Sequence, residues 1–274
     1  MKANKTTLEF TLLTFCIAYF SAGILIIASH FGYTVYNWVS SFAQLLADLP
    51  FAIYILSPAI ASFLVLKKNR KIESLAEWLK NVFYVKNSWQ LYFYVFAMLA
   101  LYFFIHYLLA QDKEFAQPFY TFFLSIPGNL FIGGLEEAGW TYVLQADLAQ
   151  KCGYIRSSFF TAMIWLLWHI PLFFIAGTNH STGAINFVMF AIQLMAFRFV
   201  YGAIYQLAEK GGVFLCILFH TLFNALSPIF TSVVMTWQGT ILANGALLLI
   251  SLISVFLQNK KGPADFTSTG GSKK

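Results

Sequence analysis

The sequence predicts an all-α, polytopic membrane protein with about eight transmembrane helices. Of its 274 residues, 59% are hydrophobic and only 10% are charged, and the mean hydropathy is +0.70. Charged residues make up roughly a quarter of a typical soluble domain. Apolar runs of about 20 residues, each able to cross a hydrocarbon core of about 30 Å, recur along the chain. We therefore expect residues 1–261 to form a single transmembrane domain.

Eight apolar segments make up the predicted spans. The second contains Asp48, Pro50 and Pro58, and we expect it to be bent or to begin in the membrane interface, because proline removes a helical hydrogen bond. In chain order, the predicted spans are residues 8–28, 42–66, 91–110, 119–145, 157–176, 183–206, 213–234 and 239–257.

The positions of Lys and Arg support this number of spans. Short cytoplasmic loops carry an excess of basic residues. Here basic residues precede the first span and follow the second, fourth, sixth and eighth, while the gaps between hold only Lys113. We therefore expect a multi-pass protein of the cell membrane with both termini in the cytoplasm. The net charge of +6 then requires no nucleic acid partner.

Residues 72–86 predict an amphipathic helix outside the spans. Apolar residues recur there at helical spacing, from Ile72 to Phe83, with charged and polar residues between them, as in a helix that lies on a membrane surface. We expect it on the cytoplasmic leaflet, with docking against protein as the alternative. Residues 262–274 are rich in Gly, Ser, Thr and Lys and are predicted to form a disordered tail.

Ionisable side chains inside the spans mark the candidate site, because each is costly in hydrocarbon unless it is paired, hydrated or functional. The helical rise places Glu136, His169 and His220 about 17, 20 and 15 Å from the cytoplasmic ends of three different spans. Asn224 lies one turn from His220 on the same helix face. The remaining residues of this kind are expected to be structural or to lie outside the spans: Asp48, His106, His30 and His180.

A carboxylate, two imidazoles and a carboxamide at one depth suit peptide hydrolysis. A glutamate can take a proton from a water molecule with help from an imidazole, and a second imidazole with an amide can stabilise an oxyanion. Glu136, His169 and His220 could instead bind Zn²⁺, since two His and one Glu form a common catalytic zinc set. Their spacing does not decide between the two kinds of site.

Three short motifs follow one another on three predicted spans. Residues 136–140 are Glu-Glu-Ala-Gly-Trp, residues 165–169 are Trp-Leu-Leu-Trp-His, and residues 220–224 are His-Thr-Leu-Phe-Asn. They resemble the Glu-Glu-x-Gly-Trp-Arg, aromatic-x-x-x-His and His-x-x-x-Asn motifs of the CAAX prenyl protease and bacteriocin-processing family of intramembrane proteases. The resemblance covers about residues 130–228, and we place the family-like core at about 119–234.

The resemblance implies an intramembrane endopeptidase whose water is activated by Glu136 with His169, while His220 and Asn224 stabilise the oxyanion. It also implies a central intramembrane cavity open to the cytoplasmic side and a peptide or protein substrate. Whether that substrate is membrane-tethered or lipidated stays open. Members of the family are often called metalloproteases; we expect no obligatory metal, with Zn²⁺ on Glu136, His169 and His220 as the alternative.

One position departs from the family pattern, because the Arg expected after Trp140 is Thr141 here. Glu137 therefore lacks the cation that it would have one turn along the helix. Arg198 lies about 12 Å from the cytoplasmic end of the sixth span, and we predict that it pairs with Glu137. Trp140 and Trp165 complete the supporting residues, mainly as packing groups, with Trp165 a candidate to line the cavity.

Two other classes of function stay open. Proton-coupled transporters also bury Glu, His and Arg at mid-depth, although the sequence contains neither an internal repeat nor a pair of interrupted helices. A non-catalytic immunity or scaffold protein is the second class, because Thr141 in place of the family Arg could weaken catalysis.

Overall fold

Helices make up the fold throughout the part of the chain that the structure describes. The computed structural model describes residues 5–36, 41–110, 115–208, 210–230 and 236–260. No strand occurs within these ranges, as the predicted all-α class requires. The predicted tail at 262–274 lies outside the described residues.

The described chain alternates long helices with short helical segments. In chain order they are α1 (Lys5–Ser29), α2 (Phe42–Ala47), α3 (Leu49–Lys68), α4 (Leu75–Val82), α5 (Trp89–Leu109), α6 (Tyr120–Phe131), η1 (Gly134–Glu136), α7 (Glu137–Gly139), η2 (Trp140–Gln145), α8 (Ala146–His169), η3 (Ile170–Phe174), α9 (Phe187–Leu207), α10 (Val213–Leu226) and α11 (Trp237–Lys260).

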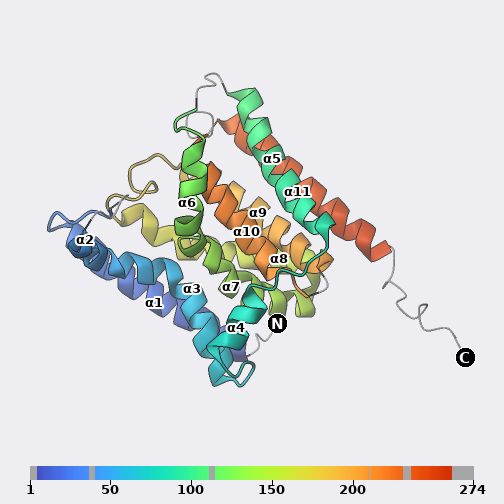
Figure 1. The fold of residues 1–274 in the computed structure, drawn as a ribbon, viewed down its shortest axis with the longest axis horizontal. Helices are drawn as coiled ribbons and strands as arrows, with labels where there is room; N and C mark the ends of the chain where they lie inside the picture. Colours follow the sequence, from blue (N-terminus) through green and yellow to red (C-terminus); the bar gives the residue numbers. More distant parts are fainter. Residues whose placement is uncertain (1–4, 37–40, 111–114, 209, 231–235, 261–274) are drawn as a thin grey trace, which may run out of the picture.

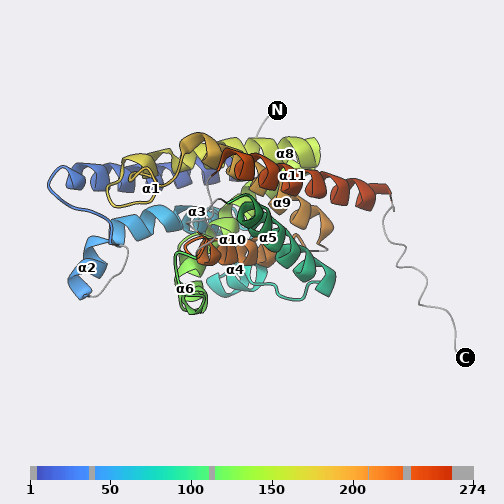
Figure 2. The same ribbon diagram turned by 90° about the horizontal axis from the view of Figure 1, so that it is seen from above.

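The long helices form a bundle with two flanks and a centre. Helices α1 and α3 pack along each other as one flank, and α11 packs against both α5 and α9 on the other. Helices α8, α9 and α10 lie between the flanks, together with the short segments η1 and α7 (Figure 1; Figure 2). The segments that carry the three motifs are therefore enclosed by the rest of the bundle.

Six helical stretches are long and apolar enough to cross a membrane, judged by length and composition within the described residues. One of them, Tyr120–Phe174, covers both the fourth and the fifth predicted spans. Helix α10 occupies the first part of the seventh predicted span and has only 14 residues. Each of the eight predicted segments overlaps a helix, and the chain is a multi-pass membrane protein.

The second predicted span is interrupted, as its sequence indicates. Helix α2 ends at Ala47, and α3 begins at Leu49 with Pro50 in its first turn, where the missing N–H of proline carries no cost. The Asp48 carboxylate accepts hydrogen bonds from the Tyr33 hydroxyl at 2.5 Å and the Tyr36 backbone N–H at 3.2 Å. Asp48 therefore has the structural role predicted for it.

Helix α4 is shorter than the predicted amphipathic helix. It begins after Ser74, whose hydroxyl accepts from the Glu77 backbone N–H at 3.2 Å, and it ends at Val82. Its Trp78 is buried, and the indole N–H donates to Ser62 Oγ of α3 at 2.9 Å. Leu75 is 51% exposed. One face of α4 thus docks on α3 while apolar side chains remain on the outer face.

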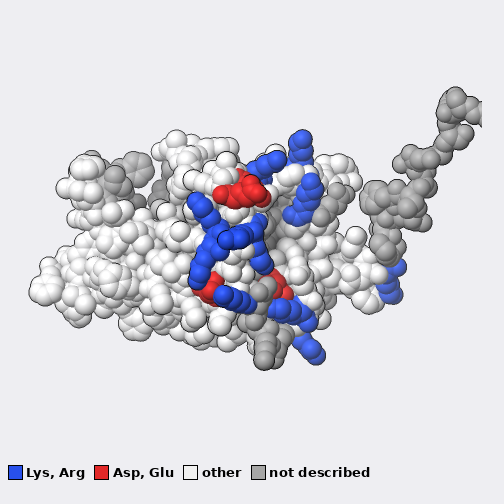
Figure 3. Space-filling view, turned by 90° about the horizontal axis from the view of Figure 1, so that it is seen from below, with Lys and Arg blue, Asp and Glu red and all other residues white. Residues whose placement is uncertain are grey.

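Basic side chains gather at one end of the bundle. Figure 3 shows most of the visible Lys and Arg on the surface at which α4 and the turn after α3 lie in Figure 1. Lys67, Lys68, Arg70 and Lys71 in this turn are exposed. This one-sided distribution agrees with the alternation of basic and non-basic loops along the sequence.

Candidate active site

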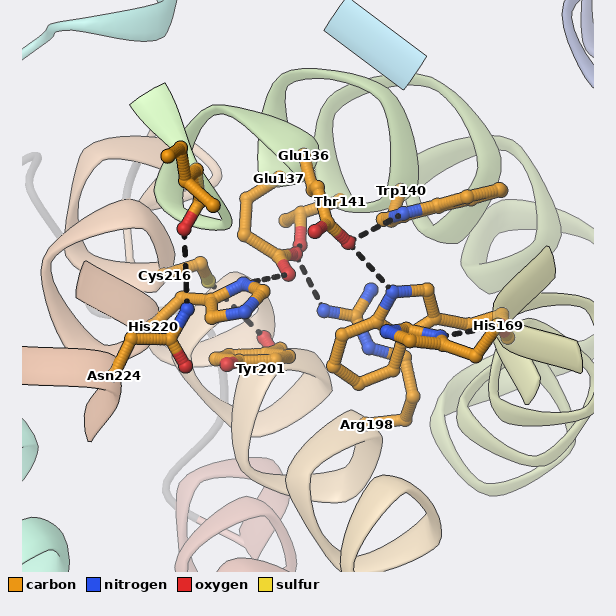
Figure 4. A network of polar contacts seen from close by, with 12 residues as sticks. Glu136, Glu137, Trp140, Thr141, His169, Arg198, Tyr201, Cys216, His220 and Asn224 are labelled. Carbon is orange, nitrogen blue, oxygen red and sulfur yellow. Dashed lines mark hydrogen bonds and ion pairs between the residues drawn. The ribbon is translucent and has the colours of Figure 1, made fainter. Parts of the chain in front are cut away.

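The first motif folds into three consecutive short helical segments. Glu136 is the last residue of the 3₁₀-helix η1, and Glu137 is the first residue of α7. Trp140 and Thr141 begin η2, which is a π-helix. Such π segments are rare and occur frequently at functional sites. The local geometry turns both glutamates towards the centre of the bundle (Figure 4).

Glu136 is held by two tryptophans. Its Oε2 accepts hydrogen bonds from the indole N–H of Trp165 at 2.9 Å and of Trp140 at 3.3 Å. Trp140 lies four residues along from Glu136, whereas Trp165 comes from α8. The side chain of Glu136 is nearly closed off, because the residue is only 4% exposed.

Glu137 is the centre of a buried ionic network. Its Oε2 accepts from Arg198 Nη2 and from the Thr141 hydroxyl, the latter at 2.6 Å. Its Oε1 lies 3.3 Å from His220 Nδ1. The Glu137–Arg198 pair that the sequence predicts is thus present, and neither side chain is exposed. Thr141, at the departure from the family pattern, supplies a hydrogen bond while α9 supplies the charge.

The Arg198 guanidinium is enclosed by aromatic rings. Its Cζ lies 4.6 Å from the ring centroid of Trp165 and 4.2 Å from that of Tyr201, distances at which a cation is attracted by the ring faces. Within the described residues, its Nε and Nη1 have no hydrogen-bond partner. The ion pair and the two rings together hold a charge that would otherwise be costly at this depth.

Both candidate histidines have their Nδ1 atoms engaged. His169 Nδ1 lies 2.8 Å from the Trp165 carbonyl oxygen; because a carbonyl only accepts, Nδ1 carries the proton and Nε2 of the neutral ring keeps a lone pair. His220 Nδ1 donates in the same way to the Glu137 carboxylate. Each histidine is 7% exposed. The Nε2 atoms are therefore the ones left for chemistry.

Asn224 and His220 converge on the backbone at Gly133. The Asn224 amide donates to the Ile132 carbonyl at 3.3 Å. Gly133 has φ = +120°, and a Cβ there would collide with Asn224 Nδ2 and lie 3.1 Å from His220 Nε2. A glycine is thus required both by the backbone conformation and by the close approach. Figure 4 shows His220 and Asn224 extending from α10 towards this segment.

The structure arranges the predicted residues as two linked sets. One set joins Glu136 to Trp140 and Trp165, and the other joins Glu137 to Arg198 and His220. Trp165 connects them, because its ring packs edge-to-face against His220 at 5.6 Å and its carbonyl binds His169. Among the described residues, no direct hydrogen bond joins Glu136 to His169, and Asn224 bonds to Ile132 instead of His220.

Several contacts could not be predicted from the sequence. The indole donors were expected to pack, and only the four-residue spacing from Glu136 to Trp140 and from Glu137 to Thr141 hinted at hydrogen bonds. His180 was placed outside the site, but its ring lies 6.2 Å from that of His169 and 4.9 Å from that of Phe190. Burial lowers the pKa of His180 to about 4. No sequence signal predicts that the loop with His180 lies beside His169.

A metal site requires a closer set of ligands than the structure contains. Within the described ranges, no three His, Cys, Asp or Glu side chains are placed so that they could hold one metal ion. Glu136, His169 and His220, as they lie in the structure, are not among such groups.

A large apolar cavity lies on the other side of α10. It measures about 990 Å³ and is lined by aromatic and aliphatic residues of α5, α6 and α10, among them Phe103, Phe122 and Leu222. None of the predicted site residues lines it. This cavity is separate from the carboxylates and imidazoles of the candidate site.

The fold and the site define a multi-pass helical membrane protein with a buried set of carboxylates and imidazoles. Residues 116–226 match the family model described as type II CAAX prenyl endopeptidase Rce1-like. This match supports the resemblance to the CAAX prenyl protease and bacteriocin-processing family that the motifs indicate. At the level of the family, the match supports a CAAX-protease-like intramembrane endopeptidase, which is a hydrolase that acts on a peptide or protein. The sequences of curated proteins contain no significant match.

Proposed function

We propose that this protein hydrolyses a peptide bond within the membrane with a water molecule activated by Glu136. One observation supports the proposal above the others: a nearly buried carboxylate, oriented by two indoles, shares the centre of the bundle with two imidazoles. Since both Nδ1 atoms are engaged, both imidazoles keep Nε2 for the reaction.

The reaction proceeds through a tetrahedral intermediate. Water bound between Glu136 and Nε2 of His169 gives a proton to the Glu136 carboxylate as its oxygen attacks the scissile carbonyl carbon. His220 Nε2–H and the Asn224 amide donate to the oxyanion. The proton then passes from Glu136 to the leaving amine as the C–N bond breaks. The products are a carboxylic acid and an amine.

Glu137 has a supporting role through His220. A carboxylate that accepts from Nδ1–H fixes the orientation of the imidazole ring. Arg198 and Thr141 in turn hold the Glu137 carboxylate. The family Arg is thus replaced by a residue of another helix together with a hydroxyl, and we infer that the replacement preserves activity.

We propose that the reaction has no obligatory metal. Zn²⁺ would need Glu136, His169 and His220 to move together, because no three such side chains in the described residues are placed to hold one ion. Cleavage is therefore expected to persist after dialysis against a strong chelator. Loss of cleavage on chelation, with recovery on addition of Zn²⁺, would favour the zinc site.

We also propose how the protein lies in its membrane. Its two termini and the basic end of the bundle face the cytoplasm. The central cavity that the family resemblance implies at the candidate site opens to the same side. The chain belongs to the cell membrane. The substrate is a peptide or protein; prenylated and unprenylated peptides are the two forms to compare.

Substitution of the reacting groups tests the mechanism. Purified protein is assayed for peptide cleavage as wild type and as Glu136→Gln, His169→Ala and His220→Ala, with the fold checked by circular dichroism. Each variant is expected to lose at least about 100-fold in kcat/KM. His106→Gln is the matched control, because His106 is a buried histidine outside the network.

The same assays separate the other classes of function. Normal cleavage by Glu136→Gln refutes the mechanism. Proton-coupled uptake by sealed vesicles, without cleavage, indicates a transporter. Binding of a peptide that the wild type never cleaves indicates a scaffold or immunity protein.

A further inference from the structure

Trp165 contacts four residues of the candidate site. Its indole N–H donates to Glu136 Oε2, and its carbonyl accepts from His169 Nδ1. The Arg198 guanidinium lies over its ring, and His220 packs against it edge-to-face. The residue is only 1% exposed. A side chain with such contacts has more than a packing role.

We propose that Trp165 and Trp140 act as an indole clamp, a pair of positioning residues that hold the Glu136 carboxylate by one oxygen. The clamp rests on the proposed function, since it sets the direction from which Glu136 takes the proton of water. Both indoles donate to Oε2, and neither uses Oε1. Oε1 is therefore the oxygen that receives the proton.

The chemistry of indole makes it suited to this role. An indole N–H donates but has no acceptor atom, so it cannot take the proton in place of the carboxylate. A hydrogen bond to an ionised carboxylate favours the ionised form and is stronger than a bond between neutral groups. Two such donors offset part of the cost that burial imposes on the ionised form of Glu136.

The clamp is built from two independent parts of the chain. Trp140 projects from the π-helix η2, and its ring is fixed edge-to-face by Phe10 at 5.7 Å and by Trp168 at 5.9 Å. Trp165 lies four residues before the end of α8. Because both rings are immobilised, the carboxylate between them loses the freedom to rotate. Fixed geometry of this kind lowers the barrier to reaction.

Replacement of indole by phenyl isolates the hydrogen bond. Trp165→Phe and Trp140→Phe keep a ring at each position, and the Trp165 carbonyl that binds His169 remains. Each variant is expected to lower kcat about tenfold with KM unchanged. The acidic limb of the pH–rate profile is expected to move to higher pH, because the ionised carboxylate has lost a donor. Trp78→Phe is the matched control: it removes a buried indole bond of 2.9 Å to Ser62, and its ring packs against Phe63, neither of which belongs to the candidate site.

Indole N–H resonances give a readout that does not depend on activity. The chain has seven tryptophans, and the three Phe variants assign the signals of Trp78, Trp140 and Trp165 in ¹⁵N-tryptophan-labelled protein in micelles. Glu136→Gln is expected to shift the signals of Trp140 and Trp165 and to leave that of Trp78 in place.

These measurements separate the clamp from the mechanism that it serves. Retained cleavage by Glu136→Gln refutes the glutamate mechanism itself. Lost cleavage in Glu136→Gln, with unchanged kcat and pH profile in both Trp variants, overturns the clamp alone. Signals of Trp140 and Trp165 that do not respond to Glu136→Gln overturn it as well. A lower kcat without a shifted acidic limb indicates that the two rings only pack.

Discussion

At the scale of single residues, Glu137 shows how the chain accommodates a buried charge after a change in its motif. The carboxylate has no exposed surface and is neutralised by Arg198 of α9, with Thr141 as a further donor. An unpaired carboxylate at this depth would be strongly unfavourable. The loss of a motif Arg is therefore compatible with the fold only if another helix supplies a cation.

This dependence predicts a marked asymmetry between single and double substitutions. Arg198→Met leaves the Glu137 charge unpaired and is expected to lower the free energy of unfolding by about 3–5 kcal/mol. Glu137→Gln combined with Arg198→Met removes both charges and is expected to recover most of that loss. Thermal unfolding in detergent measures both effects.

Measurement of peptide cleavage shows whether the Glu137–Arg198 pair stabilises only the fold or also assists the reaction. The double variant is expected to remain poorly active, because the carboxylate that holds Nδ1 of His220 is gone. Equal stability of the single and double variants would show that the pair contributes nothing beyond packing.

At the scale of elements, the junction between α6 and η1 sets the geometry of the site. Gly133 turns the chain with φ = +120°, so that η1 places Glu136 and α7 places Glu137 against α8, α9 and α10. The π-helix that follows directs Trp140 and Thr141 back to the two carboxylates. Irregular backbone is tolerated at membrane depth when it is enclosed by protein.

Gly133→Ala tests this junction. A Cβ would collide with the Asn224 amide and lie 3.1 Å from His220 Nε2. Displacement of these groups by about 1 Å is expected to lower kcat/KM by about 100-fold. Gly245→Ala is the control, since nothing lies within 4 Å of the added Cβ. Full activity of Gly133→Ala would mean that His220 and Asn224 need not approach this backbone.

The loop after η3 adds a dependence of stability on pH. Burial lowers the pKa of His180 to about 4 from its ordinary value of 6.5. Between these values the unfolded chain binds more protons than the folded one, so the free energy of unfolding falls as the pH is lowered through this window. The stability that neutral His180 contributes is fully present above a pH of about 6.5.

His180→Phe is therefore expected to lose less stability than the wild type between pH 6.5 and pH 4. Unfolding is followed at several pH values in detergent, with His30→Phe as the control because His30 is exposed. An unchanged pH dependence in His180→Phe would show that this ring does not titrate on unfolding.

At the scale of the whole molecule, the one-sided distribution of charge bears on orientation. Basic side chains lie at the end that contains α4 and the turn after α3 (Figure 3). Positively charged loops stay on the cytoplasmic side during insertion. The segment that carries His180 belongs to a gap without Lys or Arg and is expected on the opposite side.

Cysteine labelling tests this orientation. In a background in which Cys16, Cys152 and Cys216 are replaced by Ser, single cysteines are introduced by Lys71→Cys and by Asn179→Cys, at two exposed positions. An impermeant maleimide added to intact cells is expected to label only the Asn179→Cys protein, and Lys71→Cys should react after the membrane is opened. The reverse pattern would invert the proposed topology.

The sequence by itself determined the class of protein, the approximate positions of the helices and a set of candidate site residues. Hydropathy and the cost of burying an ionisable group are local properties. Apolar segments, and ionisable residues within them such as Glu136, His169 and His220, can therefore be recognised from the sequence. Depth along the helices was enough to predict the pair between Glu137 and Arg198, 61 positions apart. Asp48, Pro50 and Pro58 indicated the interruption of the second span, whereas α4 is shorter than the helix predicted at 72–86.

Only the tertiary structure decided which groups bond to which. The Trp165 bond to Glu136, the place of Asn224 beside Ile132 and the return of His180 towards His169 join segments whose relative rotation has no signature in the sequence. Depth gives the level of a side chain in the membrane but not the direction in which it points. That direction depends on the packing of α8, α9 and α10 around the irregular turn at Gly133.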